Sequence, residues 1–288
     1  MKYTEDAALI NCAGATLAAI LTQPEAPADT GVIIIVGGPQ YRAGSHRQFV
    51  HLCRALATAG YPAVRFDYRG MGDSSGEKRD FLAVDADIAS MIDFMHARVP
   101  QVRNIVLWGL CDGASAALLY CHATKDCRIK GLCLLNPWIR SEVSLAKTQV
   151  KHYYSQRLRE KAFWLKLISG KVAATALTGL ARGIKTAFFA TKSKVAPSDF
   201  LPFQVRMSQA WKNFNGPILL LLSADDFTAK EIAEHGKTSG SWSGLLEQPS
   251  VERQELSNAD HTCSSAALRM VAEKQTVNWL GRCVLGSR

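Results

Sequence analysis

Asn104-Ile-Val-Leu-Trp-Gly-Leu-Cys-Asp-Gly113 is the stretch of sequence that decides the fold. The residues before the turn form an apolar run, typical of a buried strand, and an Ala-rich segment that follows, 114–123, has the composition of a helix. The turn itself, Gly109-Leu-Cys-Asp-Gly113, has a thiol at its centre and glycines that allow a strand and a helix to pack closely. We therefore expect Cys111 to project above one edge of a sheet, where the helix N-terminus favours its thiolate form.

The rest of the chain repeats this alternation of strands and helices. Such an alternation predicts the α/β class, with a mostly parallel sheet flanked by helices on both faces. A length of 288 residues suits one such domain with an insertion. The expected strands are a hairpin over 8–21, then 31–36, 63–66, 104–108, 129–135, 217–222 and a weaker one over 251–256; the expected helices cover about 45–59, 81–98, 114–123 and 265–279.

Residues 140–210 interrupt the alternation. They contain no strand signal but do contain amphipathic helical stretches, such as Phe163-Trp-Leu-Lys-Leu-Ile168. We predict a helical lid, inserted after the sixth strand, with 1–139 and 211–288 forming the core.

The basic character of the chain is concentrated in one segment. The net charge is +9, and Arg140 to Lys212 carry 14 Lys and Arg against three acids, a balance of +11 that leaves −2 for the remainder. A basic lid predicts an anionic partner: an acyl-phosphopantetheine carrier, an acidic polysaccharide, or an anionic membrane surface into which Trp164, Phe188 and Phe189 would insert. A solvated lysine-rich surface is the alternative. No nucleic acid is expected, because the charge lies on no recognisable binding module.

Two later segments supply partners for the thiol. Ser223-Ala-Asp-Asp226 ends an apolar strand, and Asp260-His-Thr262 precedes the C-terminal helix. The order nucleophile, acid, histidine predicts that His261 is the base and that Asp226 orients its ring. Asp225 remains an alternative, and either acid could instead cap the helix that starts near Thr228.

An oxyanion hole is expected beside the thiol. Its first donor is the backbone N–H of Asp112. The second comes from Gly37-Gly-Pro-Gln40, where Pro39 has no N–H, so the donor is Gly38 or Gln40, with Gln40 preferred. The Asp112 carboxylate would disfavour the thiolate unless it points away or meets a cationic group.

The other cysteines and histidines suggest no metal site. None of the eight cysteines has CxxC spacing and the histidines are scattered, so we expect no metal and no cofactor. The polar N-terminus and the lack of a long apolar run predict neither a signal peptide nor a membrane span. We expect a cytoplasmic protein that the basic segment could hold at the periphery of the inner membrane.

Several of these strings resemble a known family. The core resembles the α/β-hydrolase superfamily, and three strings resemble the exosortase A system-associated hydrolase, type 1, of bacterial exopolysaccharide and PEP-CTERM protein-sorting loci. The resemblance implies the triad Cys111, Asp226 and His261, but no substrate. A nucleophilic cysteine also resembles dienelactone hydrolases, although the long lid departs from their pattern. The core strings are Val36-Gly-Gly-Pro-Gln40 and Phe66-Asp-Tyr-Arg-Gly-Met-Gly-Asp-Ser-Ser-Gly76; the narrower ones are Gly109-Leu-Cys-Asp-Gly-Ala-Ser115, Asp226-Phe-Thr-Ala-Lys-Glu231 and Ala259-Asp-His-Thr262.

The expected activity is acyl transfer through a thioester on Cys111. Water as acceptor gives an esterase or thioesterase, and an amine or thiol acceptor gives an acyltransferase. A peptidase-like hydrolase and a non-catalytic scaffold of the same fold are the alternatives.

Overall fold

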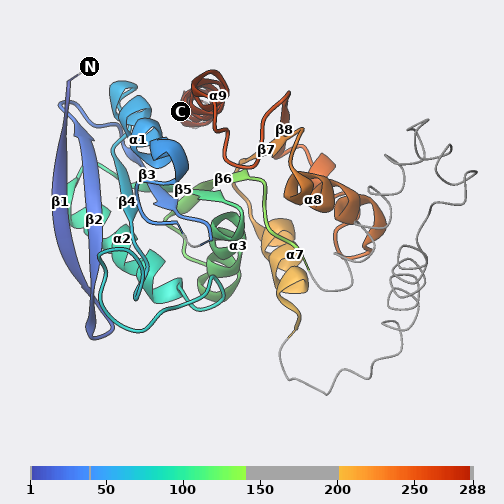
Figure 1. Ribbon diagram of the computed structural model, residues 1–288, viewed down its shortest axis with the longest axis horizontal. Helices are drawn as coiled ribbons and strands as arrows, with labels where there is room; N and C mark the ends of the chain where they lie inside the picture. The colour runs from blue at the N-terminus through green and yellow to red at the C-terminus, as the bar shows by residue number, and fades with distance from the viewer. Residues whose placement is uncertain (1, 39, 141–200, 286–288) are drawn as a thin grey trace, which may run out of the picture. The chain divides into compact units, whose positions relative to one another are not determined.

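Eight strands form one sheet, in the order β1-β2-β4-β3-β5-β6-β7-β8. The structure is a computed structural model that describes residues 2–38, 40–140 and 201–285 (Figure 1). β1 pairs with β2 and β2 with β4 in antiparallel fashion, and all other pairs are parallel. The predicted α/β class and mostly parallel sheet are therefore confirmed. The strands are β1 (Tyr3–Cys12), β2 (Ala15–Pro24), β3 (Thr30–Ile35), β4 (Ala63–Phe66), β5 (Asn104–Leu110), β6 (Ile129–Leu135), β7 (Ile218–Ser223) and β8 (Val251–Leu256).

The central strands are buried along their length because helices cover both faces of the sheet. Every residue of β3, β4 and β7 is buried, which explains why these strands are mostly apolar, with Arg65 of β4 as the buried charged residue. The edge strand β1 instead alternates between half-buried and exposed positions, typical of a strand with one solvated face. The core therefore sits on the β3, β5, β6 and β7 strands, next to the predicted nucleophile turn.

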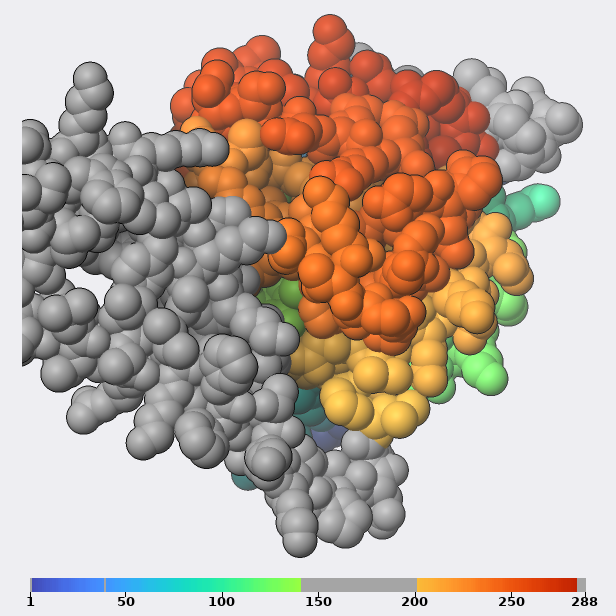
Figure 2. Space-filling model, turned by 90° about the vertical axis from the view of Figure 1, so that its right-hand side faces the viewer, coloured from blue at the N-terminus to red at the C-terminus, as the bar shows by residue number. Residues whose placement is uncertain are grey.

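Two layers of helices pack on the sheet. α1 and α9 pack against each other, and on the opposite side α3 packs against both α2 and α7 (Figure 1). Seen from the side of α8, the described surface is made mostly by the segments after Pro202, coloured yellow to red in Figure 2. The helices are α1 (Gln48–Thr58), α2 (Asp85–Arg98), α3 (Asp112–Thr124), α7 (Phe203–Asn213), α8 (Phe227–Thr238) and α9 (Ala266–Leu285).

Two helices begin later than the sequence pattern predicts. α1 starts at Gln48 rather than Ser45, because His46 and Arg47 have left-handed φ angles of 52° and 60°. α2 starts at Asp85 rather than Phe81, since the Asp80 carboxylate accepts the Leu82 N–H and holds a turn there. The N-terminal hairpin is longer than expected, because the two-residue turn at Ala13-Gly14 lets both strands continue for ten residues.

The chain divides into two compact units, Met1–Ile139 with Pro202–Arg288, and Arg140–Leu201. The core unit resumes at Pro202, and α7 packs on α3, so residues 202–210 lie with the core rather than in the insertion. Almost all of the remaining predicted lid, residues 141–200, lies outside the described residues, and its helical character stays a prediction.

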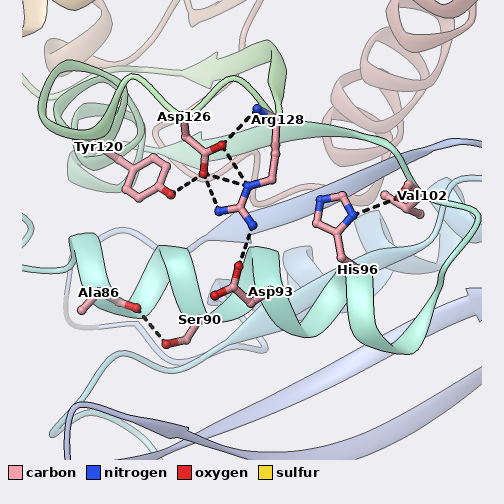
Figure 3. A network of polar contacts seen from close by, with 8 residues as sticks. All are labelled: Ala86, Ser90, Asp93, His96, Val102, Tyr120, Asp126 and Arg128. Carbon is pink, nitrogen blue, oxygen red and sulfur yellow. Dashed lines mark hydrogen bonds and ion pairs between the residues drawn. The ribbon is translucent and has the colours of Figure 1, made fainter.

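A polar network ties α2, α3 and β6 together (Figure 3). The Asp126 carboxylate accepts the Tyr120 hydroxyl at 2.8 Å and the Arg128 guanidinium at 2.6 Å. Arg128 also reaches Asp93 of α2 at 2.6 Å. This network anchors the segment between α3 and β6, at the end of the sheet opposite the nucleophile turn.

Candidate active site

The predicted site residues follow the carboxyl ends of three parallel strands. Cys111 follows β5, Asp226 lies three residues after β7, and His261 lies five residues after β8. β5, β6, β7 and β8 are consecutive neighbours in one sheet, so these ends meet at the same edge. The fold thus brings together residues that are 150 positions apart in the chain.

Cys111 occupies the sharp turn between β5 and α3. Its backbone has φ 57° and ψ −123°, a conformation that non-glycine residues rarely adopt. Its N–H donates to Leu135 O of β6 at 2.9 Å, and its C=O accepts the Trp138 N–H at 3.1 Å. These bonds hold the strained turn, and the thiol is left partly exposed.

Glycines make this turn possible, as the sequence pattern predicted. A Cβ at Gly109 would lie 2.5 Å from the Ala114 N atom, and one at Gly113 would collide with Ile35 O of β3. The helix therefore starts in direct contact with the sheet.

Asp226 is the acid that meets the histidine. Its Oδ2 accepts His261 Nδ1–H at 2.9 Å. The same oxygen accepts the Ala229 N–H at 3.1 Å, as the N-cap of α8. Asp226 is buried, whereas Asp225 is exposed. The two roles considered for this position, orienting a histidine and capping a helix, thus fall on one oxygen atom.

His261 lies between a carboxylate and a thiol. Its pKa is raised to about 10, first by the hydrogen bond to Asp226 and next by the hydrogen bond to Cys111. Burial opposes the shift but does not cancel it. Because a raised pKa favours the charged form, the imidazolium persists through neutral pH and is lost only as the pH approaches about 10. The charged ring is therefore hydrogen-bonded on one side to the Asp226 carboxylate and on the other to the Cys111 sulfur.

Asn136 is a site residue that the sequence pattern did not reveal. It is fully buried just after β6. Its side chain accepts the Ser223 N–H at 2.8 Å and donates to Ser223 Oγ at 2.9 Å and to His261 O at 3.1 Å. Asn136 therefore joins the end of β6 to the end of β7 and fixes the loop that carries His261. Its position, directly after an apolar strand, was the available signal.

Among the predicted oxyanion donors, the Gly38 N–H already has an acceptor in this structure. The Gly38 N–H donates to Asp112 Oδ1 at 2.5 Å, and the nearby amides of Gly113 and of Asp112 itself act to lower the pKa of the same carboxyl group. The Gln40 side chain faces elsewhere, with its Oε1 accepting from Ser45 N and Gln48 Nε2. The Asp112 side chain thus turns toward the backbone amides and away from the core.

The remaining cysteines lack such surroundings. Burial raises the pKa of Cys263 to about 11 and that of Cys53 to about 12, so both are protonated at neutral pH. Cys127 is exposed and lies before the start of β6, at the end of the sheet opposite His261. Among the described cysteines, Cys111 is the one with a hydrogen bond to a histidine.

Two cavities among the described residues lie at the opposite end of the sheet, where the parallel strands begin. One, of about 710 Å³, is lined by Asn104, Lys130 and Pro217, at or next to the first residues of β5, β6 and β7. Within the described residues, no group of three or more His, Cys, Asp or Glu side chains could hold a metal ion. No helix in the same residues is long and apolar enough to cross a membrane.

Curated relatives match the chain over short segments. Human Protein ABHD12B is 27% identical over 116 residues, which are 38% of this chain and 31% of that protein. Lysophosphatidylserine lipase ABHD12 of Gallus gallus is 33% identical over 86 residues, 30% of this chain and 22% of that protein. The match therefore spans less than a third of the length of either relative.

Solved structures match nearly the whole chain. The Pyrococcus furiosus esterase Pf2001 has a TM-score of 0.63 at 15% identity, covering 98% of this chain and 92% of that one. Est1E of Butyrivibrio proteoclasticus, with bound ferulic acid, has a TM-score of 0.62 at 16% identity, covering 96% and 99%. A dienelactone hydrolase of Anabaena variabilis has 0.61 at 11%, covering 98% and 99%. At these identities the likeness shows the fold alone, and it confirms the predicted α/β-hydrolase fold.

A family model gives the more specific relationship. The model described as serine aminopeptidase, S33, matches residues 28–235, well over half of the chain. The matched segment includes the nucleophile turn and Asp226. With the α/β-hydrolase fold and this match, the chain belongs to the serine aminopeptidase S33 family of α/β hydrolases.

Proposed function

We propose that the protein hydrolyses an ester or thioester through an acyl intermediate on Cys111. The observation that carries the proposal is the placement of a partly exposed thiol on a strained strand–helix turn, hydrogen-bonded to a histidine that is itself held by a buried carboxylate. Covalent acyl transfer requires a nucleophile that contacts a base, and a base that contacts an orienting group.

The first half of the reaction forms the acyl enzyme. The Cys111 thiolate attacks the carbonyl carbon and a C–S bond forms, while the carbonyl π electrons move to oxygen. The oxyanion then collapses, the bond to the leaving alkoxide or thiolate breaks, and the His261 imidazolium gives that group its proton. The products are a thioester on Cys111 and the free alcohol or thiol.

Water completes the cycle. The now neutral His261 takes a proton from a water molecule, whose oxygen attacks the thioester carbonyl. Collapse breaks the C–S bond and releases the carboxylic acid, and the thiolate–imidazolium pair is restored. Asp226 keeps the Nδ1–H tautomer throughout, so that Nε2 faces the thiol.

Cysteine at the centre of the turn departs from the serine that the family description names. The hydrogen bond between Cys111 and His261 supports the change, because a histidine beside a cysteine is the usual arrangement that activates its sulfur. The esterase and lipase names among the relatives support a carboxylic ester as the substrate class. The motif strings around Cys111 support a role beside exopolysaccharide or exosortase systems. The basic segment Arg140–Lys212 supports an acyl group that is bound to an anionic carrier.

An acyltransferase would use the same intermediate and differ only in the acceptor. A non-catalytic scaffold has less support, because a chain without chemistry has no need to keep a strained thiol, a paired histidine and a buried acid together. A peptidase-like reaction is compatible with the family name but has no further support from the site.

Intact-mass spectrometry tests the proposal. The protein is incubated with p-nitrophenyl esters of short and medium chain length and with acyl-pantetheine thioesters. We expect one acyl adduct and steady turnover, both absent in Cys111→Ala. Cys127→Ala, which removes the exposed thiol near the start of β6, is the matched control and should behave as the unchanged protein.

The outcomes separate the alternatives. An adduct that persists in Cys111→Ala would show that another group is acylated and would end the proposal. An adduct on Cys111 that decays only after an amine or thiol is added would support the transferase. No adduct with any acyl donor would favour the scaffold.

A further inference from the structure

Asp112 presents its carboxylate to the amides that an oxyanion would need. Oδ1 accepts the Gly38 N–H at 2.5 Å, and the amides of Asp112 and Gly113 lie near enough to favour the charged form of the same carboxyl group. The Asp112 and Gly38 amides are two of the donors predicted for the oxyanion hole. A negatively charged oxygen of the protein itself therefore stands where the negatively charged oxygen of a tetrahedral intermediate would stand.

The backbone leaves little room to share this position. A Cβ at Gly37 would collide with Leu110 O and would lie 3.1 Å from Asp112 Oδ1. The loop after β3 is thus pressed against the end of β5, with the carboxylate beside it. A substrate oxygen and the carboxylate cannot both accept the one Gly38 hydrogen with good geometry.

We propose that the Asp112 carboxylate fills the oxyanion hole of the free protein, that an ester must displace it before Cys111 can be acylated, and that Asp112 thereby determines which acyl substrates react. The inference rests on the proposed function, since it assigns a role within that reaction. Small esters, which offer few other contacts, lack the binding energy to displace the carboxylate. Esters with a negative charge next to the carbonyl are disfavoured further by repulsion. Larger uncharged acyl groups, which gain contacts elsewhere, are the class selected.

The groups around Asp112 decide its charge. His261 faces it as a cation from the loop after β8, and Tyr68 lies near it from the loop after β4. Cys111 precedes it in the chain. Burial raises the pKa of Asp112, and the bonds from Gly38 and Gly113 oppose the rise. Protonation weakens its hold on the amides, because hydrogen bonds to a charged acceptor are the stronger kind.

A graded series of variants tests the displacement. Asp112→Asn keeps an oxygen acceptor but removes its charge, and Asp112→Ala removes the acceptor. We expect the rate of Cys111 acylation by p-nitrophenyl acetate at pH 8 to rise about five- to tenfold in Asp112→Ala, the difference between a charged and an absent hydrogen bond. Asp112→Asn should fall between. Asp225→Asn removes an exposed carboxylate next to Asp226 in sequence and should change nothing.

Alkylation of Cys111 by iodoacetamide separates displacement from a change in the thiolate. Alkylation requires the thiolate but no oxyanion hole. The proposal expects its rate to change much less than the acylation rate. An equal rise in both rates would overturn it, because Asp112 would then act only on the charge of the thiol.

Two more measurements bear on the position of the carboxylate. Acetate should inhibit Asp112→Ala competitively and the unchanged protein hardly at all. Only in the variant are the backbone N–H groups of the oxyanion hole free of the Asp112 carboxylate and able to bind acetate. Asp112→Asn should be acylated faster than the unchanged protein, and this difference in rate should shrink as the pH falls, because Asp112 of the unchanged protein then becomes protonated. Acylation that is slower in both variants overturns the inference while leaving the proposed function intact; no acylation of any variant, with Cys111 still alkylated, removes both.

Discussion

At the scale of single residues, Asp226 combines two tasks in one atom. Its Oδ2 orients His261 and also accepts the Ala229 N–H at the start of α8. The first task depends on negative charge, because it stabilises the imidazolium. The second requires only an oxygen acceptor, which Asn supplies about as well as Asp. Substitutions at this position can therefore separate the two.

Asp226→Asn should reduce kcat/KM by about 10²- to 10⁴-fold, as expected when the orienting charge is lost, with the midpoint of thermal unfolding nearly unchanged. Asp226→Ala should lose the same activity and also about 1 kcal/mol of stability, because the helix cap is gone. Steady-state kinetics and thermal melts measure the two effects. Asp225→Asn is the control. If Asp226→Asn kept full activity, or Asp225→Asn lost it, Asp226 would not be the orienting acid.

The triad candidates were visible in the sequence, but the contacts that position them were not. Strand ends and turn glycines pointed to Cys111, Asp226 and His261, since parallel strands place their carboxyl ends at one edge. The direction of the Asp112 side chain depends on a loop more than 70 residues away, around Gly38. The bond from Asn136 to the His261 loop spans 125 positions. Such contacts follow from strand order, which local patterns do not encode.

At the scale of elements, the turn between β5 and α3 is held by close backbone contact. Gly113 lies against Ile35 O and Val36 O at the end of β3. Any side chain there must push α3 away from the sheet, and α3 carries Asp112 in its first turn.

Gly113→Ala should destabilise the fold by about 1–3 kcal/mol, the usual cost of overpacking a tight core. Chemical denaturation measures the free energy of unfolding. Gly281→Ala in α9 is the matched control, because nothing lies within 4 Å of its added Cβ. Alanine there should stabilise the helix by about 0.5–1 kcal/mol. Equal effects of the two substitutions would contradict the close contact at the turn.

Sequence periodicity located most elements and misplaced some boundaries. The apolar strands stood out because helices bury them on both faces. α7 was assigned to the insertion, because its apolar face resembles that of any amphipathic helix and only its packing on α3 shows where it belongs. The left-handed residues before α1 could not be foreseen either, since neither His46 nor Arg47 is a glycine.

At the scale of the whole molecule, the candidate active site lies where the parallel strands end, and the polar network of Asp126 and Arg128 lies where they begin. The Arg128 guanidinium holds the pKa of Asp126 down, to about 2. A depressed carboxyl pKa contributes stability above the unfolded value, about 3.8, and that contribution is lost as the pH falls toward about 2.

Asp126→Asn should therefore lower the midpoint of thermal unfolding at pH 7, with the difference from the unchanged protein disappearing by about pH 2. Thermal melts across this range provide the measurement. Asp93 is the other partner of Arg128, and its side chain is 68% exposed. Asp93→Asn should therefore lower the midpoint of thermal unfolding much less. If the midpoint of Asp126→Asn stayed below that of the unchanged protein by the same amount down to pH 2, the charge of the Asp126 carboxylate would play no part in stability.

The shared oxygen of Asp226 also governs how copies of this chain would diverge. In a duplicated gene released from selection for turnover, Cys111 and His261 are free to drift, but folding still demands an acceptor at the start of α8. Ser, Thr or Asn would satisfy that demand, and only turnover demands the negative charge. Among descendants, an uncharged capping residue at position 226 would therefore mark the lineages in which catalysis was abandoned while the fold survived.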